Sequence, residues 1–174
     1  MQKVSRIEWP TVGLFVGTYV LWALSIFWVA GGALWLAVPL AAIAIAFHGS
    51  LQHEAIHGHP TRWASVNAGF AWPPLSIVVP YLRFRDTHLD HHRDADLTDP
   101  YDDPETHFMA PDDWAKLSAP IKHFRVVNNT LAGRLILGPL IGTFCFFRSD
   151  WRQRNDDPRI GHGWRGHAVA LVTI

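Results

Sequence analysis

WPTVGLFVGTYVLWALSIFWVAGGALWLAVPLAAIAIAFHGSLQH, residues 9–53, contains no Asp, Glu, Lys or Arg. A membrane-spanning helix needs about 20 predominantly apolar residues, so this stretch is long enough for two. The glycine pair at 31–32 is the natural break between them, and Trp28 and Trp35 flank it, as expected at a membrane–water interface. The sequence therefore predicts a transmembrane helical hairpin whose second helix covers about Ala33–Gly58.

Basic residues lie outside both ends of this stretch. Lys3 and Arg6 precede the first span, and the second is followed by Arg62, Arg83, Arg85 and Arg93. Cytoplasmic segments of membrane proteins are enriched in Lys and Arg, so we expect the N-terminus and the residues after the second span to be cytoplasmic, in a bacterial inner membrane. A cleaved signal peptide is the alternative for the first span. However, Trp9–Ala30 exceeds a normal signal-peptide core, and a second apolar segment follows at once.

Five histidines form two clusters just beyond the apolar stretch. They are His53-Glu54-Ala55-Ile56-His57 and His88-Leu89-Asp90-His91-His92. Helix residues at i, i+3 and i+4 share one face, so each cluster can direct its imidazoles at one point. Imidazole is the commonest neutral metal ligand and suits iron, copper, zinc and nickel. The sequence predicts a metal centre at the membrane edge, with the ligands His53, His57, His88, His91 and His92.

The other histidines fit that centre less well. On a regular helix His48 is rotated by about 140° from His53 and about 180° from His57, so we expect it to point elsewhere. His59 precedes Pro60, where the helix should end. The remaining histidines are isolated and expected at the surface: His107, His123, His162 and His167.

His53-Glu54-x-x-His57 also matches the zinc protease signature in which the glutamate is the general base. A membrane metalloprotease is therefore an alternative, although the second cluster would supply more ligands than one tetrahedral zinc needs. If the metal is iron, we expect Glu54 to accept a hydrogen bond from the N–H of a ligand imidazole and so to orient it. The acids flanking the second cluster either do the same or form a solvated helix face: Asp86, Asp90 and Asp94.

After the hairpin, the chain is predicted to contain interfacial segments, one loop and the start of a further span. Val66–Leu82 is apolar but carries three prolines, which favours an interfacial or re-entrant segment. A helix should begin near Arg83, and Asp94–Glu105 should be a loop. Leu131–Phe147 is broken by glycines and a proline, and five arginines follow it, so we expect it to lie along the inner leaflet. A further span is expected to start near Gly166.

Composition fits one membrane-embedded domain over residues 1–174. Hydrophobic residues make up 49% of the chain, and its zero formal charge gives no indication of a nucleic-acid partner. The single cysteine, Cys145, excludes an intrachain disulfide and Cys-based metal sites, and we expect it to pack in an apolar environment. We therefore expect an all-α integral membrane protein. Its hairpin is followed by cytosolic or interfacial helices carrying the histidine clusters, and then by the start of another span.

On these residues the chain resembles the membrane fatty acid desaturases, with the related carotenoid ketolases and hydroxylases and alkane hydroxylases. His53–His57 matches their first histidine box, H-x(3,4)-H, and His88–His92 matches the second, H-x-x-H-H, about thirty residues later. Their third box, which follows a second hairpin, is absent. We therefore expect a single desaturase-like domain truncated before that box, inactive by itself, in which the two clusters still converge.

The resemblance implies a non-haem centre of two Fe that uses O₂ to oxidise an unactivated C–H bond. The implied reaction is desaturation of a lipid acyl chain, with hydroxylation or ketolation of a carotenoid or other lipid as the alternative. It also implies a membrane lipid or acyl substrate and an external electron donor of the ferredoxin or cytochrome type. No catalytic residue is expected beyond the metal ligands. A non-catalytic membrane protein is the remaining alternative.

Overall fold

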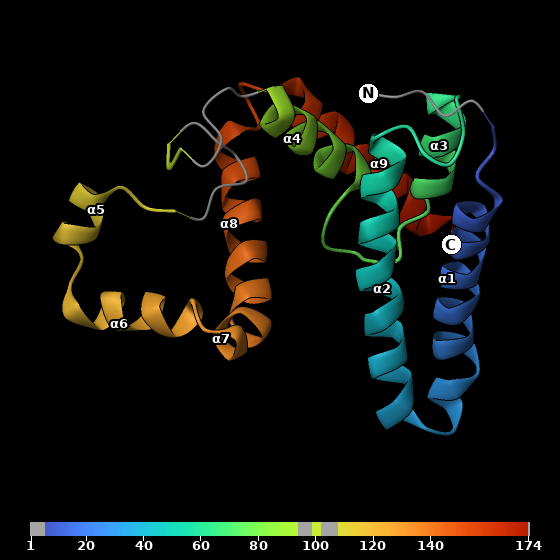
Figure 1. Cartoon of the computed structure of the whole chain (residues 1–174), viewed down its shortest axis with the longest axis horizontal. Helices are drawn as coiled ribbons and strands as arrows, with labels where there is room; N and C mark the ends of the chain where they lie inside the picture. Colours follow the sequence, from blue (N-terminus) through green and yellow to red (C-terminus); the bar gives the residue numbers. More distant parts are fainter. Residues whose placement is uncertain (1–5, 94–98, 102–107, 174) are drawn as a thin grey trace. The chain divides into compact units, whose positions relative to one another are not determined.

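The fold is seen in a computed structural model that describes residues 6–93, 99–101 and 108–173 (Figure 1). All regular secondary structure in these residues is helical, which confirms the all-α class. The elements are α1 (Trp9–Phe27), η1 (Val29–Gly31), α2 (Leu34–Ile56), α3 (Ala64–Ala71), α4 (Tyr81–Arg93), α5 (Pro111–Lys116), α6 (Ala119–Asn128), α7 (Leu131–Ile136), α8 (Gly138–Gln153) and α9 (Pro158–Val172). They fall into two compact units, residues 1–85 with 163–174, and residues 86–162. Lys3, Asp94, His107 and most of the predicted loop Asp94–Glu105 lie outside the described residues.

α1 and α2 form the predicted hairpin and lie side by side, joined by the short turn of η1 (Figure 1). Among the described residues these are the two helices long and apolar enough to cross a membrane. Only 17% and 22% of their most apolar windows are buried within the protein, so most of their surface is left for lipid. A core helix of a soluble protein would be mostly buried. The outermost aromatic side chains are the most open, with Trp28 77% and Trp35 80% exposed at the turn.

Three segments of the first unit meet at the hydroxyl of Tyr19 on α1. It donates a hydrogen bond to the carbonyl of Phe70, at 2.7 Å. Nε2 of His48, on α2, lies 2.9 Å from the same oxygen. Because the single Tyr19 proton goes to a carbonyl, which only accepts, His48 is assigned as the donor in the second bond. This contact ties α1 to α2 and α3.

The connection after α2 is held by a buried polar cluster. Gly58 has φ +98°, a left-handed conformation that glycine adopts without strain, and it turns the chain away from the helix. Asn67 on α3 is 0% exposed and donates from Nδ2 to the carbonyl of Thr61, at 2.8 Å. Its Oδ1 accepts from the backbone N–H and the hydroxyl of Thr61, at 2.9 and 2.7 Å. These bonds fix the loop that follows His57.

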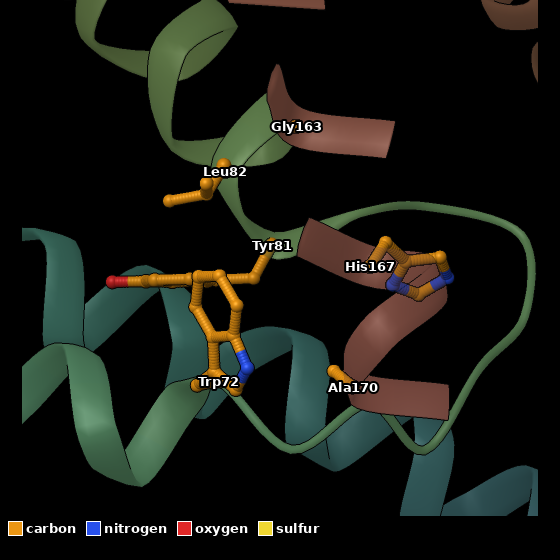
Figure 2. Close-up of a pocket in the computed structure, with 6 residues that line it drawn as sticks. All are labelled: Trp72, Tyr81, Leu82, Gly163, His167 and Ala170. Atoms are coloured by element: carbon orange, nitrogen blue, oxygen red, sulfur yellow. The ribbon is translucent and has the colours of Figure 1, made fainter. Parts of the chain in front are cut away.

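The first turn of α4 is anchored in the core of the first unit. Tyr81 and Leu82 are buried, and the C-terminal half of α9 packs against them (Figure 2). Two glycines permit this approach: a Cβ at Gly163 would lie 2.9 Å from Cγ of Arg83, and one at Gly166 would lie 2.9 Å from a ring carbon of Trp72. α4 begins two residues before the predicted Arg83 and continues to Arg93. Val66–Leu82 is divided between α3, an irregular segment and the start of α4, and its position in the membrane stays a prediction.

In the second unit, the apolar stretch Leu131–Phe147 forms two helices instead of one. The hydroxyl of Thr130 caps α7 by accepting from the N–H of Gly133 at 3.1 Å, and α7 ends before α8 starts at Gly138. Neither helix qualifies as a span among the described residues, in line with the sequence argument. The packing role predicted for Cys145 is wrong, because its side chain is exposed on α8. The helix that contains Gly166 begins at Pro158, eight residues earlier than the start expected for a further span.

Candidate metal centre

The first histidine pair lies at the C-terminal end of α2. His57 is the C-cap residue, and its N–H donates to the carbonyl of His53 at 3.2 Å. This last turn brings the two ring centres to 4.5 Å. Nδ1 of His53 is 3.5 Å from a carboxylate oxygen of Glu54, the contact expected of an acid that orients an imidazole. The side chains of His53 and Glu54 are both about half exposed, so this contact lies at the surface of the first unit.

The second pair lies on the part of α4 that belongs to the second unit. His88 is 5% exposed, and its Nε2 is 3.0 Å from Nε2 of His92, one helical turn later. Their ring centres are 4.5 Å apart. The ring of His91 is farther off, 6.3 Å from His88 and 5.7 Å from His92. The i, i+4 spacing thus produces the close pair, and the assignment of His91 as a ligand stays a prediction.

The geometry of the second pair fits a bound metal ion. An imidazole nitrogen binds a transition metal at about 2.0–2.1 Å, so two such nitrogens at a right angle on one ion are about 3.0 Å apart. The Nε2 atoms of His88 and His92 have this separation. Each of four imidazoles, those of His53, His57, His88 and His92, could offer a ring nitrogen to a metal ion. This neutral nitrogen donor set suits iron as well as zinc.

Three other histidines have protein partners that the sequence did not reveal. His48 is 3% exposed and bonded to Tyr19, which agrees with its expected direction away from His53 and His57. Nδ1 of His59 is 2.9 Å from the carboxylate of Glu8. His167 was expected at the surface, and this is wrong. It is 6% exposed, lines a small cavity in the first unit (Figure 2), and its Nε2 lies 3.3 Å from the carbonyl of Ile77. The surface prediction is confirmed for His123 and His162.

The acid at the centre of the second cluster binds cations. Asp90 is 3.0 Å from Nη2 of Arg159 and 3.4 Å from Nη1 of Arg93. Hydrogen bonds to Asp157 and then to Asp90 raise the pKa of the Arg159 guanidinium above its usual range. For Asp90 the structure therefore favours an ion-paired helix face over support of an imidazole. The sequence shows several arginines in residues 148–165, but only the fold of the second unit brings Arg159, and not another of them, to Asp90.

Comparison with known proteins gives one match. The model of the family described as "Fatty acid desaturase" matches residues 28–174. A search of curated proteins and a search of solved structures found no match. The family match supports an oxidoreductase of the desaturase or hydroxylase type, and members of such a family typically use iron. Together with the two apolar helices it indicates a membrane protein. Because the match covers most of its length, the chain belongs to the fatty acid desaturase family.

Proposed function

We propose that this protein desaturates a lipid acyl chain in an O₂-dependent reaction at a non-haem di-iron centre. The observation that carries the proposal is the 3.0 Å spacing of Nε2 in His88 and His92, within a chain that matches the desaturase family over residues 28–174. The His53–His57 pair at the end of an apolar span supports it, because it places further imidazoles where a lipid-active centre needs them.

The residues that would hold the two irons are His53, His57, His88, His91 and His92. When bound, the irons would activate O₂ and oxidise an unactivated C–H bond. The protein's own part is to orient the imidazoles. The carboxylate of Glu54 lies 3.5 Å from Nδ1 of His53, where it would orient that ring and leave Nε2 for the metal. His88 is 5% exposed, and this burial restricts its ring to few rotamers.

The proposal that the two pairs serve one centre comes from the sequence spacing of the two clusters. Within the first unit, Tyr81 and Leu82 in the first turn of α4 share a core with Leu51 and Ala55 of α2. α4 is continuous from Tyr81 to Arg93, so the second cluster follows this anchored turn on the same helix.

The substrate proposed is a membrane lipid or its acyl chain, since the spans leave most of their apolar surface to lipid. Hydroxylation or ketolation of a carotenoid or another lipid is the alternative within the same chemistry. Electrons are proposed to come from an external ferredoxin- or cytochrome-type donor, because the sequence carries no haem-attachment, flavin or iron–sulfur motif. The N-terminus and both histidine clusters are proposed to be on the cytoplasmic side of a bacterial inner membrane.

Metal analysis combined with product analysis tests this proposal in the full-length protein. Purified enzyme should contain about two irons per chain and, with O₂ and a reduced donor, should introduce a double bond into phospholipid acyl chains. A hydroxylated or keto product would favour the alternative chemistry. One zinc per chain with peptide hydrolysis would favour the metalloprotease interpretation of His53-Glu54-x-x-His57. Absence of stoichiometric metal would contradict all three.

A further inference from the structure

A surface groove at the start of α1 has no role in the proposed oxidation. It has a volume of ≈ 410 Å³ and lies between the residues that precede α1 and those that precede α3. Its lining combines two cations with three large apolar side chains: Arg6, Ile7, Trp9, Arg62 and Trp63. That volume is within the range of about 300–1,000 Å³ usual for small-molecule sites. None of the five candidate metal ligands contributes to it.

The two walls of the groove are fixed to each other. The backbone N–H of Glu8 donates to the carbonyl of Pro60 at 3.0 Å, and the Glu8 carboxylate is bonded to Nδ1 of His59. The segment before α3 is in turn held by the buried Thr61–Asn67 bonds. The groove is thus formed in advance of any ligand, which lowers the entropy cost of binding.

The cations of the groove are not neutralised by nearby acids. Glu8 is the nearest acid in sequence, but its carboxylate contacts His59 and the hydroxyl of Thr11. The guanidinium of Arg62 stacks over the ring of Trp63, 4.5 Å from its centre, and the described part of the chain offers neither Arg6 nor Arg62 an ion pair. A guanidinium stacked on an indole keeps its N–H edge directed outward, which is the geometry that binds phosphate oxygens in a forked pair of bonds.

The position of the groove indicates that a phosphate bound there would belong to a membrane lipid. Trp9 is the first residue of the first span and is 70% exposed, and Trp63 is 46% exposed. Tryptophan at the end of a span sits at the depth of the lipid headgroups. Because Trp9 both lines the groove and begins α1, an acyl chain could follow the apolar surface of α1 while its headgroup stays with the arginines. Free phosphate in solution would make no use of Ile7, Trp9 or Trp63.

We propose that this groove binds one anionic phospholipid, with its phosphate between Arg6 and Arg62 and its acyl chains along Trp9 and α1. A zwitterionic lipid carries its own cation and would leave the two guanidinium charges less compensated. The site would hold a lipid that is bound and not oxidised, and it would fix the depth of α1 in the leaflet. This proposal does not depend on the metal centre.

Lipid titration of the full-length protein in mild detergent tests the proposal, with bound lipid counted by native mass spectrometry. Phosphatidylglycerol should bind one molecule per chain at least roughly tenfold more tightly than phosphatidylcholine, since each arginine near a phosphate contributes about a fivefold gain. The R6Q/R62Q variant should lose most of this preference, and R6K/R62K should keep part of it. The K116Q/K122Q variant removes the same charge from α5 and α6 and should bind as the wild type does.

Two outcomes would overturn the proposal. Equal phosphatidylglycerol binding in R6Q/R62Q and K116Q/K122Q would show that the groove is not the site. Complete displacement of the lipid by millimolar inorganic phosphate would show a soluble-anion site instead. Iron content and the melting temperature of each variant should match the wild type. If the double variant is not monodisperse, R62Q alone should weaken binding about fivefold, and unchanged binding in folded R62Q would contradict the assignment.

Discussion

The middle and the end of α2 carry histidines with opposite surroundings. His48, in the middle, is 3% exposed and bonded through Nε2 to Tyr19 on the neighbouring helix. The rings of His53 and His57, at the end, lie 4.5 Å apart at an angle of 57°, and Nδ1 of His53 contacts Glu54. The first histidine uses its nitrogen to join two spans, whereas the others are arranged with carboxylate support of the kind that metal ligands have. These histidines are of one residue type and on one helix, so neither property explains their different roles. The rotation of about 140° between His48 and His53 does, because it directs the two side chains to different surroundings.

Alanine replacements of the candidate ligands at the end of α2 and on α4 are expected to have the largest effect. His53→Ala, His57→Ala or His88→Ala in the full-length enzyme should abolish product formation and reduce bound iron, since each removes a ligand. His91→Ala is expected to do the same. His123→Ala is the matched control, an exposed imidazole on α6, and should change neither iron content nor product. Full activity in folded His91→Ala would remove that residue from the ligand set.

Glu54→Gln gives a smaller effect and separates two chemistries. In the oxidative mechanism Glu54 orients His53, and losing such a partner typically costs about 10- to 100-fold in metal affinity or activity. In a metalloprotease the same glutamate is the general base, and Gln would abolish turnover with zinc still bound. Iron content and product yield, measured together, distinguish the cases. Asp113→Asn, on α5, serves as a control for loss of one carboxylate.

Asn67→Ala tests the loop that follows the end of α2. Asn67 is fully buried, and its amide makes three bonds with Thr61, so alanine leaves several backbone and hydroxyl groups without partners. Each buried unsatisfied group costs about 1–3 kcal/mol, and we expect a loss of about 3 kcal/mol in unfolding free energy. Thermal unfolding in detergent measures it. Gly69→Ala on the same helix, where a Cβ meets nothing within 4 Å, should be neutral or slightly stabilising. Equal melting temperatures for both variants would mean that the cluster does not hold the loop.

Tyr19→Phe tests the middle of α2 and should have the smallest effect. It removes the hydroxyl that joins His48 to the carbonyl of Phe70, at an expected cost of about 1–2 kcal/mol. Iron content should stay at the wild-type value, because the network lies apart from the His53–His57 pair. Thermal unfolding and iron analysis of the same preparation check both statements. Loss of iron without loss of stability would mean that the middle of the helix takes part in the metal centre after all.

Features set by neighbouring residues were predictable from the sequence. The hairpin follows from uninterrupted apolar length and a glycine break, and α2 ends within two residues of the predicted Gly58. The pairs at 53/57 and 88/92 follow from helical spacing, which the ring distances confirm. That Leu131–Phe147 forms no helix of span length follows from its glycines and proline, whereas its division at Leu137 into two helices was not predicted.

Features set by distant residues were not predictable. The buried position of His167 depends on α9 packing against Trp72 and the first turn of α4, which Gly163 and Gly166 permit. The sequence offers Asp90 several arginines as partners, and only the fold of the second unit shows that Arg159 forms the ion pair. Cys145 lies in an apolar stretch but is exposed, since the second unit leaves that side of α8 uncovered. Each of these depends on whether distant segments come into contact, which the local pattern does not encode.

The sequence by itself determined the two helices of the hairpin, their apolar length, and which imidazoles share a helix face, because periodicity and chain length act within about 20 residues. Only the tertiary structure decided which polar groups those faces meet. A hydrogen-bond partner is chosen by three-dimensional proximity, so Tyr19 for His48, Thr61 for Asn67 and Pro60 for Glu8 appear only when the chain is folded. The groove of Arg6 and Arg62 has the same origin: its two cations are far apart in sequence and become one surface when the loop after α2 returns to the start of α1.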